Sequence, residues 1–354
     1  VLTGTRGDYR CAEEISDVSV PATLQATIAA RIDRLGVDAK RCLGAAAVIG
    51  MRFDTGLLEQ LGVHAMLEEL IAAELVEPVL QWHGAQYAFR HPMIRTVAYE
   101  SQLRSDRAGI HRKLAHALEV GESVDADENA ALIAEHLAAA GDQAAAFDWL
   151  MKSASWSASR DIRAAQASWL RALEVADRLP GDEPATLAKR IAARASICGY
   201  AWRSDATITH TGFEELRELC EITGDRISLA VGMAGTATAT LFDTRYGDAN
   251  AMANDLIELL DSIGDPTLFV GLAIAAANVK MQVGEPQAAL RIADRAIEGA
   301  HDDATMASMI IGSPLAMALG VRAFSLLSLG LSGFAAEFDR ALRVSRDVDD
   351  TTSF

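Results

Sequence analysis

The chain has 354 residues, of which 50% are hydrophobic, and its formal net charge is −17. This length allows two or three domains with well-buried cores. The acidic balance argues against a general nucleic-acid binder, because Lys and Arg side chains that neutralise phosphates supply most of that affinity. The four cysteines have no metal-ligand spacing, so we expect reduced, structural thiols.

The first residues predict a β-hairpin around Gly7-Asp8, and residues 1–17 lack the continuous apolar segment of a secretory signal. Because the chain begins without Met, we expect a fragment of something longer. The most apolar later run, residues 307–334, contains Pro314 and Arg322. Buried repeat helices explain that run better than a membrane span does, and we expect a cytoplasmic protein without membrane attachment.

Apolar periodicity and cap residues predict several short helices in the first part of the chain. A hairpin follows them, with a turn at His83-Gly84-Ala85. Helices followed by a terminal hairpin predict a winged helix-turn-helix. The first expected helix begins at residues 20–25 and ends at Gly36. Further helices are expected at residues 38–49, 55–61 and 64–76, and strands at residues 76–82 and 86–90.

Many winged helices bind DNA through the last helix before the wing. Here residues 53–89 contain no Lys or Arg, and the helix that would read the bases carries Glu68, Glu69 and Glu74. Phosphates would repel such a helix. We therefore expect no direct DNA contact, and a surface that faces protein or nucleotide instead.

Residues 90–116 form a basic patch in this acidic chain, with Glu100 and Asp106 as its only acids. One interpretation is a solvated helix face that balances acidic neighbours. The other is a docking surface for a phosphate or an acidic partner. The basic residues are Arg90, Arg95, Arg104, Arg107, Arg112 and Lys113.

From about residue 128 the sequence consists of Ala-rich helical pairs separated by short turns. Residues 289–297 and 336–342 share an Asp-Arg-Ala-apolar pattern that resembles tetratricopeptide (TPR) repeats, although the spacing is irregular. Such repeats present a concave face to a partner. The expected turns are Gly141-Asp142, Gly224-Asp225, Gly247-Asp248, Gly264-Asp265 and Gly284-Glu285, and the aromatic residues that either line the groove or lie in the core are Trp149, Trp156, Trp169 and Trp202.

Motifs for catalysis are absent from the sequence. No Lys follows a Gly, so there is no P-loop, and neither a His-Glu-x-x-His nor a Gly-x-Ser-x-Gly pattern occurs. We expect no enzymatic activity, no metal and no bound cofactor in this segment.

Two motifs carry a family resemblance. Val-Pro-Ala-Thr-Leu-Gln-Ala-Thr-Ile-Ala-Ala-Arg-Ile-Asp-Arg-Leu at residues 20–35 and Phe-Arg-His-Pro-Met-Ile-Arg-Thr-Val-Ala-Tyr-Glu-Ser at residues 89–101 resemble segments that follow the nucleotide-binding core in signal-transduction ATPases with numerous domains. That class includes large LuxR-type transcription regulators, and similar modules occur in actinobacterial proteins with a class III adenylate cyclase domain. The resemblance implies ATP or ADP binding, and ATPase or cyclase activity, for a longer protein.

The resemblance also implies a role for His91. In related switches the winged helix packs against the nucleotide, and a His just after the wing contacts the ADP phosphate. His91 matches that position, with Arg90 and Arg95 beside it, although Pro92 replaces the usual acidic residue. A neutral imidazole can donate to a phosphate oxygen. Alternatively, His91 caps the following helix, with Pro92 at its first position.

The sequence thus predicts a mainly α chain: a winged helix-turn-helix with a small β-hairpin, followed by an α-solenoid of degenerate TPR-like helix pairs. The expected function is regulation, in which the winged helix couples the nucleotide state of an upstream domain in cis to an arm that binds a protein or a small inducer. The alternative is a stand-alone TPR-like scaffold. The expected segments are the tail of a nucleotide-binding domain (1–19), the winged helix with its following helix (20–120), the first helical pairs (121–180) and the main array (185–354), with a linker at residues 182–184.

Overall fold

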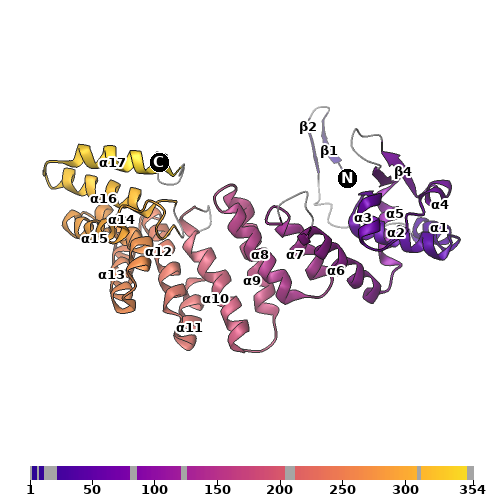
Figure 1. The fold of residues 1–354 in the computed structure, drawn as a ribbon, viewed down its shortest axis with the longest axis horizontal. Coiled ribbons are helices and arrows are strands. Elements are labelled where there is room, and N and C mark those ends of the chain that lie inside the picture. The colour runs from indigo at the N-terminus through magenta and orange to yellow at the C-terminus, as the bar shows by residue number, and fades with distance from the viewer. Residues whose placement is uncertain are drawn as a thin grey trace. The chain divides into compact units, whose positions relative to one another are not determined.

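The computed structural model describes residues 2–5, 8–11, 22–79, 86–120, 126–203, 212–308 and 312–348, with side chains from Leu24 onward. The chain divides into two units, which we call unit 1 (Val1–Asp142) and unit 2 (Gln143–Phe354). These units differ from the four segments expected from the sequence, whose boundaries stay predictions. Figure 1 shows the order of the helices and strands.

Unit 1 combines short helices with two small antiparallel sheets. In the first sheet, β1 (Leu2–Thr5) pairs with β2 (Asp8–Cys11), which confirms the N-terminal hairpin. The remaining elements are α1 (Ala22–Asp33), α2 (Val37–Ile49), β3 (Arg52–Asp54), α3 (Thr55–Gln60), α4 (Leu67–Ala72), β4 (Val76–Val79), β5 (Gln86–Phe89), α5 (Pro92–Glu100), α6 (Arg104–Val120) and α7 (Ala130–Ala139).

The second sheet has the order β3-β5-β4. β4 and β5 are the two strands predicted for the wing, and Val76 lies opposite Phe89. Their predicted turn at His83-Gly84-Ala85 lies outside the described residues. The sequence did not predict β3, which pairs with β5 on the other side, Arg52 opposite Ala88.

Helix α4 is shorter than the predicted residues 64–76. It ends at Ala72, and the next turn closes through a hydrogen bond from the Leu75 N–H to the Leu70 carbonyl (3.0 Å), with Glu74 in the left-handed region at φ 52°. Residues 73–75 therefore redirect the chain into β4. The core below this turn is built around α2, whose Ala39, Cys42, Leu43, Ala45 and Ala46 are at most 1% exposed and pack with residues of α1, α5 and the sheet.

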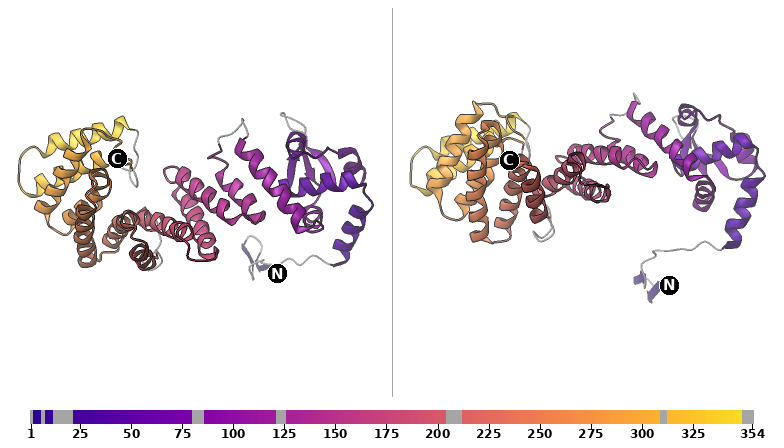
Figure 2. Two further views of the ribbon diagram at one scale, coloured as in Figure 1. Left: turned by 60° about the horizontal axis from the view of Figure 1, so that its bottom comes forward. Right: turned by 90° about the horizontal axis from the view of Figure 1, so that it is seen from below.

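Unit 2 consists of successive antiparallel helix pairs (Figure 1). Helices α10, α12, α14 and α16 pack in sequence against one another, and each also packs against the next helix in the chain. Figure 2 shows this order from two further directions. The pairs are α8 (Gln143–Ser157) with α9 (Ile162–Arg178), α10 (Pro184–Gly199) with α11 (Phe213–Thr223), α12 (Arg226–Phe242) with α13 (Tyr246–Ile263), α14 (Pro266–Gln282) with α15 (Pro286–Ala300), and α16 (Pro314–Ser328) with α17 (Phe334–Asp347); the 3-10 turn η1 (Ala201–Arg203) follows α10.

Most predicted Gly-Asp turns are helix ends. Gly264 is the left-handed C-cap of α13 (φ 73°), and the Asp265 carboxylate caps α14 by accepting from the Thr267 N–H at 2.8 Å. Gly supplies the left-handed residue and Asp the N-cap acceptor, so two residues suffice to reverse the chain. The predicted turn at Gly247-Asp248 was wrong: both residues lie in the first turn of α13, and the chain reverses at Thr244, whose φ is 61°.

The predicted linker at residues 182–184 does not separate two compact units. Pro184 begins α10, and α10 packs directly against α9 in the same unit. The Arg190 guanidinium stabilises this connection, since it donates to Asp182 at 2.7 Å and to the Leu179 carbonyl at 3.0 Å.

In the apolar run at residues 307–334, α16 is an array helix with eight buried residues. Among the described helices, none combines the length and apolarity that crossing a bilayer requires.

Candidate functional site

The junction between β5 and α5 holds the residues expected to sense phosphate. His91 is the N-cap of α5: its backbone is extended, and its Nδ1 accepts from the Met93 N–H at 3.2 Å. Pro92 occupies the first helical position, where no backbone N–H is needed. The capping role of His91 is thus confirmed. A neutral imidazole that accepts at Nδ1 carries its proton on Nε2, and no described residue accepts a hydrogen bond from Nε2 of this exposed side chain.

Arg90 and Arg95 do not converge with His91. Arg90 is exposed and forms ion pairs with Glu74 (3.8 Å) and Glu77 (3.5 Å) on the β4 side of the sheet. Arg95 instead donates from Nε to the Ala47 carbonyl at 2.9 Å, near the end of α2. A shared phosphate-binding role of the three residues stays a prediction.

The rest of the basic patch is also engaged inside unit 1. Arg112 donates to the carbonyl of Ala140, the C-cap of α7 (3.2 Å), and Lys113 to that of Leu61, the C-cap of α3 (3.2 Å). Arg107 donates to the Tyr99 carbonyl in the last turn of α5 (3.1 Å). Helix C-termini carry unpaired carbonyls and partial negative charge, so these cations stabilise helix ends. Arg90 has carboxylate partners instead, and Arg104 is the one member of this patch without a polar partner among the described residues.

Unit 1 also contains a buried polar cluster that the sequence reasoning missed. The Tyr99 hydroxyl lies 3.0 Å from His111 Nε2, and His111 Nδ1 lies 3.0 Å from His136 Nδ1. Both imidazoles are about 95% buried, at 5% and 6% exposure. Burial and the neighbouring His136 lower the pKa of His111 to about 4, and burial lowers the pKa of His136. Both rings are therefore neutral at pH 7.

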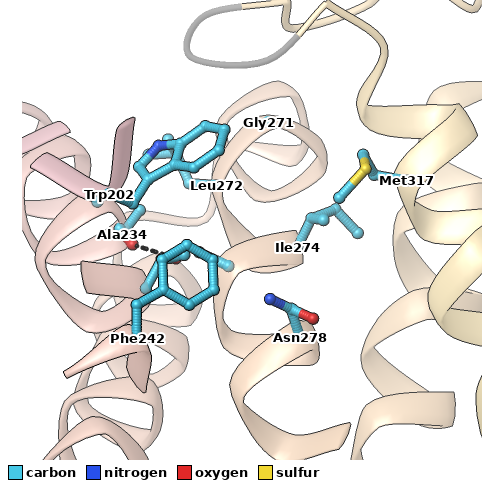
Figure 3. A pocket seen from close by; sticks show the side chains of 11 residues that line it. Trp202, Ala234, Phe242, Gly271, Leu272, Ile274, Asn278 and Met317 are labelled. Atoms are coloured by element: carbon cyan, nitrogen blue, oxygen red, sulfur yellow. Dashed lines mark hydrogen bonds between the residues drawn. The ribbon is translucent and has the colours of Figure 1, made fainter. Parts of the chain in front are cut away.

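In unit 2, a pocket of about 120 Å³ lies between α12 and α14. Figure 3 shows Trp202, which follows α10, next to Phe242 at the end of α12, with Ile274 and Asn278 of α14 and Met317 of α16 across from them. Small side chains leave room for the pocket: Ala234 on α12, and Gly271 and Ala275 on α14.

The polar side chains of this pocket are few. The Thr238 hydroxyl donates to the Ala234 carbonyl at 3.0 Å, so its lone pairs remain available. The Asn278 amide forms no hydrogen bond with any residue in the described part of the chain. Of the four tryptophans singled out in the sequence, Trp149 and Trp169 are core residues (8% and 2% exposed), and Trp202 lines this pocket.

Within the described ranges, no group of three or more His, Cys, Asp or Glu side chains could hold a metal ion. The side chains of Cys42, Cys198 and Cys220 are buried and form no disulfide, and Cys11 lies where only the backbone is described. Burial and the nearby Asp225 raise the pKa of the Cys220 thiol to about 12. These three cysteines are therefore structural.

Comparison with known proteins supports the fold. No protein-family model matches the sequence, and no curated protein matches it. Among solved structures, the chain is similar to the Signal Transduction ATPase with Numerous Domains (STAND) protein with a tetratricopeptide repeat sensor from Pyrococcus horikoshii, with 13% identity and a TM-score of 0.51. The match covers 95% of this chain and 48% of that one, so the chain spans about half the length of the solved structure. At this identity the likeness concerns the fold alone: a mainly helical chain with TPR-like helix pairs.

Proposed function

We propose that this chain is the regulatory segment of a signal-transduction ATPase. In this proposal unit 1 is a winged-helix module that follows the nucleotide state of an upstream domain, and unit 2 is a TPR-like arm that binds a protein or a small inducer. The observation that supports it most is the fold match over 95% of the chain to a protein described as a STAND ATPase with a TPR sensor. The ATPase core, and a LuxR-type or adenylate cyclase output, would belong to the longer protein.

The arrangement of unit 1 suits this role. His91 follows β5 directly and caps α5, so its Nε2–H stands on an exposed segment joined to both the sheet and the helix. A phosphate that accepted from Nε2 would contact the start of α5, which packs on α1 and α2. Nucleotide exchange would thereby act on the unit's core helices.

DNA contact by unit 1 is not proposed. Glu69 of α4 accepts from the Gly36 N–H at 2.7 Å, and Glu74 pairs with Arg31 (3.6 Å) and Arg90. Glu69 and Glu74 are thus engaged inside unit 1, and Glu68 on α4 adds to an acidic surface that would repel a phosphate backbone.

Two substitutions of His91 separate sensing from capping. Asn is a good N-cap and lacks the imidazole, whereas Ala lacks both functions. In the full-length protein, we expect His91→Asn and His91→Ala both to release bound ADP faster than the parent, measured with a fluorescent nucleotide. Faster release in His91→Ala alone would assign His91 to capping only, and unchanged release in both would favour the stand-alone scaffold.

A further inference from the structure

We propose that the pocket between α12 and α14 binds a small, neutral molecule with one aromatic ring and one polar group. This inference rests on the proposed function, in which the arm binds an inducer or a partner, and it names the chemical class of that ligand. The argument uses the size, the charge and the wall chemistry of the pocket.

The size of the pocket sets the size of the ligand. Its volume of about 120 Å³ is close to that of engineered apolar cavities of about 150 Å³ that hold benzene. A single ring with one or two substituent atoms fills it. A peptide backbone would bring several N–H and C=O groups into a site that offers few partners, and leaving them unpaired is unfavourable.

The lining residues require a neutral ligand. None of the described residues that line the pocket has a charged side chain. A carboxylate, phosphate or ammonium group would lose its hydration there without an opposite charge to replace it. The pocket therefore disfavours a ligand of either charge, even though the chain as a whole is strongly acidic.

The walls favour a ring. Trp202 and Phe242 offer aromatic faces on one side, and the Met317 thioether lies across from them (Figure 3). Offset stacking and sulfur contacts stabilise aromatic ligands beyond the area they bury. Phe242 is 59% exposed at the rim, so a bound ring would also cover a large apolar side chain that otherwise faces water.

One polar group on the ligand would find a partner. The Asn278 side chain offers both a donor and an acceptor and has no hydrogen bond to a described residue. The Thr238 oxygen can accept a second bond. A ring hydroxyl, amide or carbonyl at this position would pair with Asn278, and a ring without such a group would leave it unpaired.

We would test the inference with the 354-residue chain alone, without nucleotide, using 4-fluorophenol as the probe. This compound is neutral at pH 7, and 4-fluorobenzoate is a charged ring of similar size. Fluorine NMR line broadening should show saturable binding of 4-fluorophenol with a dissociation constant of about 0.1–1 mM, as expected for so few atoms. The benzoate should bind at least about tenfold more weakly.

Matched variants locate the binding. Ala275→Leu fills the pocket and should weaken binding about tenfold or more, whereas Ala251→Leu, on the exposed face of α13, should leave it within about twofold. Phe242→Ala removes a wall without disturbing the core, since its ring is largely exposed, and should also weaken binding. Its control is Phe324→Ala, an exposed aromatic residue of α16 outside the pocket.

Three results would overturn the inference: no saturable binding of 4-fluorophenol, equal binding of the benzoate, or equal loss of binding in the pocket variants and their controls. Circular dichroism of each variant would establish that it folds. If 4-fluorophenol does not bind, the ADP-release test of His91 can still succeed. If the His91 variants release ADP as the parent does, ring binding in unit 2 can still be observed. The two proposals can therefore fail separately.

Discussion

The Nδ1 atoms of His111 and His136 lie 3.0 Å apart inside unit 1, so one ring donates a hydrogen bond to the other. Burial lowers the pKa of both rings and so disfavours their charged forms. His111 is also bonded to the Tyr99 hydroxyl. Through this chain of bonds, Tyr99, His111 and His136 join α5, α6 and α7, and burial favours the neutral form of both imidazoles.

This pair predicts acid sensitivity of unit 1. Above pH 6.5, the ordinary pKa of His, both folded and unfolded states are neutral at these positions. As the pH falls, the unfolded chain binds protons first, because the pKa of His111 is about 4 in the folded state. Stability should fall between pH 6.5 and pH 4, by at most about 3 kcal/mol from His111. Hydrogen exchange of peptides from α6 and α7 measures this loss.

A matched pair of variants tests the assignment. His111→Gln keeps a polar side chain that cannot titrate, so exchange in α6 and α7 should depend less on pH across that window. His116→Gln, which replaces an exposed His of α6, should retain the dependence of the parent chain. An identical pH profile in the parent and in His111→Gln would show that the buried pair does not control acid unfolding.

Loss of the Lys280 side chain should destabilise unit 2. Its side chain is 8% exposed, and its Nζ donates to Asn250 Oδ1 and Glu285 Oε2, both at 2.8 Å. Hydrogen bonds from Lys280 and then Asn250 hold the pKa of the Glu285 carboxyl below its usual range. Lys280→Ala should lower the free energy of unfolding by about 2–4 kcal/mol, because it removes the cation and leaves a cavity.

Urea unfolding followed by tryptophan fluorescence would measure this effect. Arg343→Ala, an exposed cation on α17, serves as the control and should change the free energy of unfolding by less than about 0.5 kcal/mol. Lys280→Met retains the apolar stem and should lose less than Lys280→Ala. A Lys280→Ala variant as stable as the control would contradict a structural role for this network.

A side chain at position 235 should disturb the packing of α12 against α10. A Cβ atom at this position would lie 2.2 Å from the Cys198 carbonyl oxygen and 2.3 Å from that of Gly199, because α10 and α12 approach closely there. Backbone atoms cannot rotate away, so Gly235→Ala should destabilise unit 2 by at least about 2 kcal/mol. Gly320→Ala, in α16 with nothing within 4 Å of its Cβ position, should instead be neutral or stabilising by up to about 1 kcal/mol. Thermal unfolding of the two variants compares them directly, and equal melting temperatures would contradict the close approach.

Much of the helical array was predictable because its signals are local. Gly264 and Asp265 end one helix and begin the next through their own backbone preferences and caps. Gly247 and Asp248 show the same letters inside a helix, where Asp248 pairs with Arg245 in the first turn at 2.6 Å. The dipeptide alone does not distinguish these cases, since an acidic residue suits both the N-cap and the first turn of a helix.

The features that sequence reasoning missed depend on contacts between distant residues. β3 has three residues, and its strand character comes from pairing with β5, more than thirty residues later. His111 and His136 are separated by 25 positions and lie on different helices. Likewise, the pocket at Trp202 is lined by residues of α12, α14 and α16, and no spacing within one helix shows that they come together.

The basic side chains of α5 and α6 bind the ends of three other helices of unit 1. Arg95 holds the end of α2, Lys113 the end of α3, and Arg112 the end of α7, each through a backbone carbonyl. These bonds do not depend on a titratable acceptor, so a change of pH leaves the acceptors intact. A displacement of α5 would therefore strain the hydrogen bond of Arg95 to α2 together with the packing of α5 on α1.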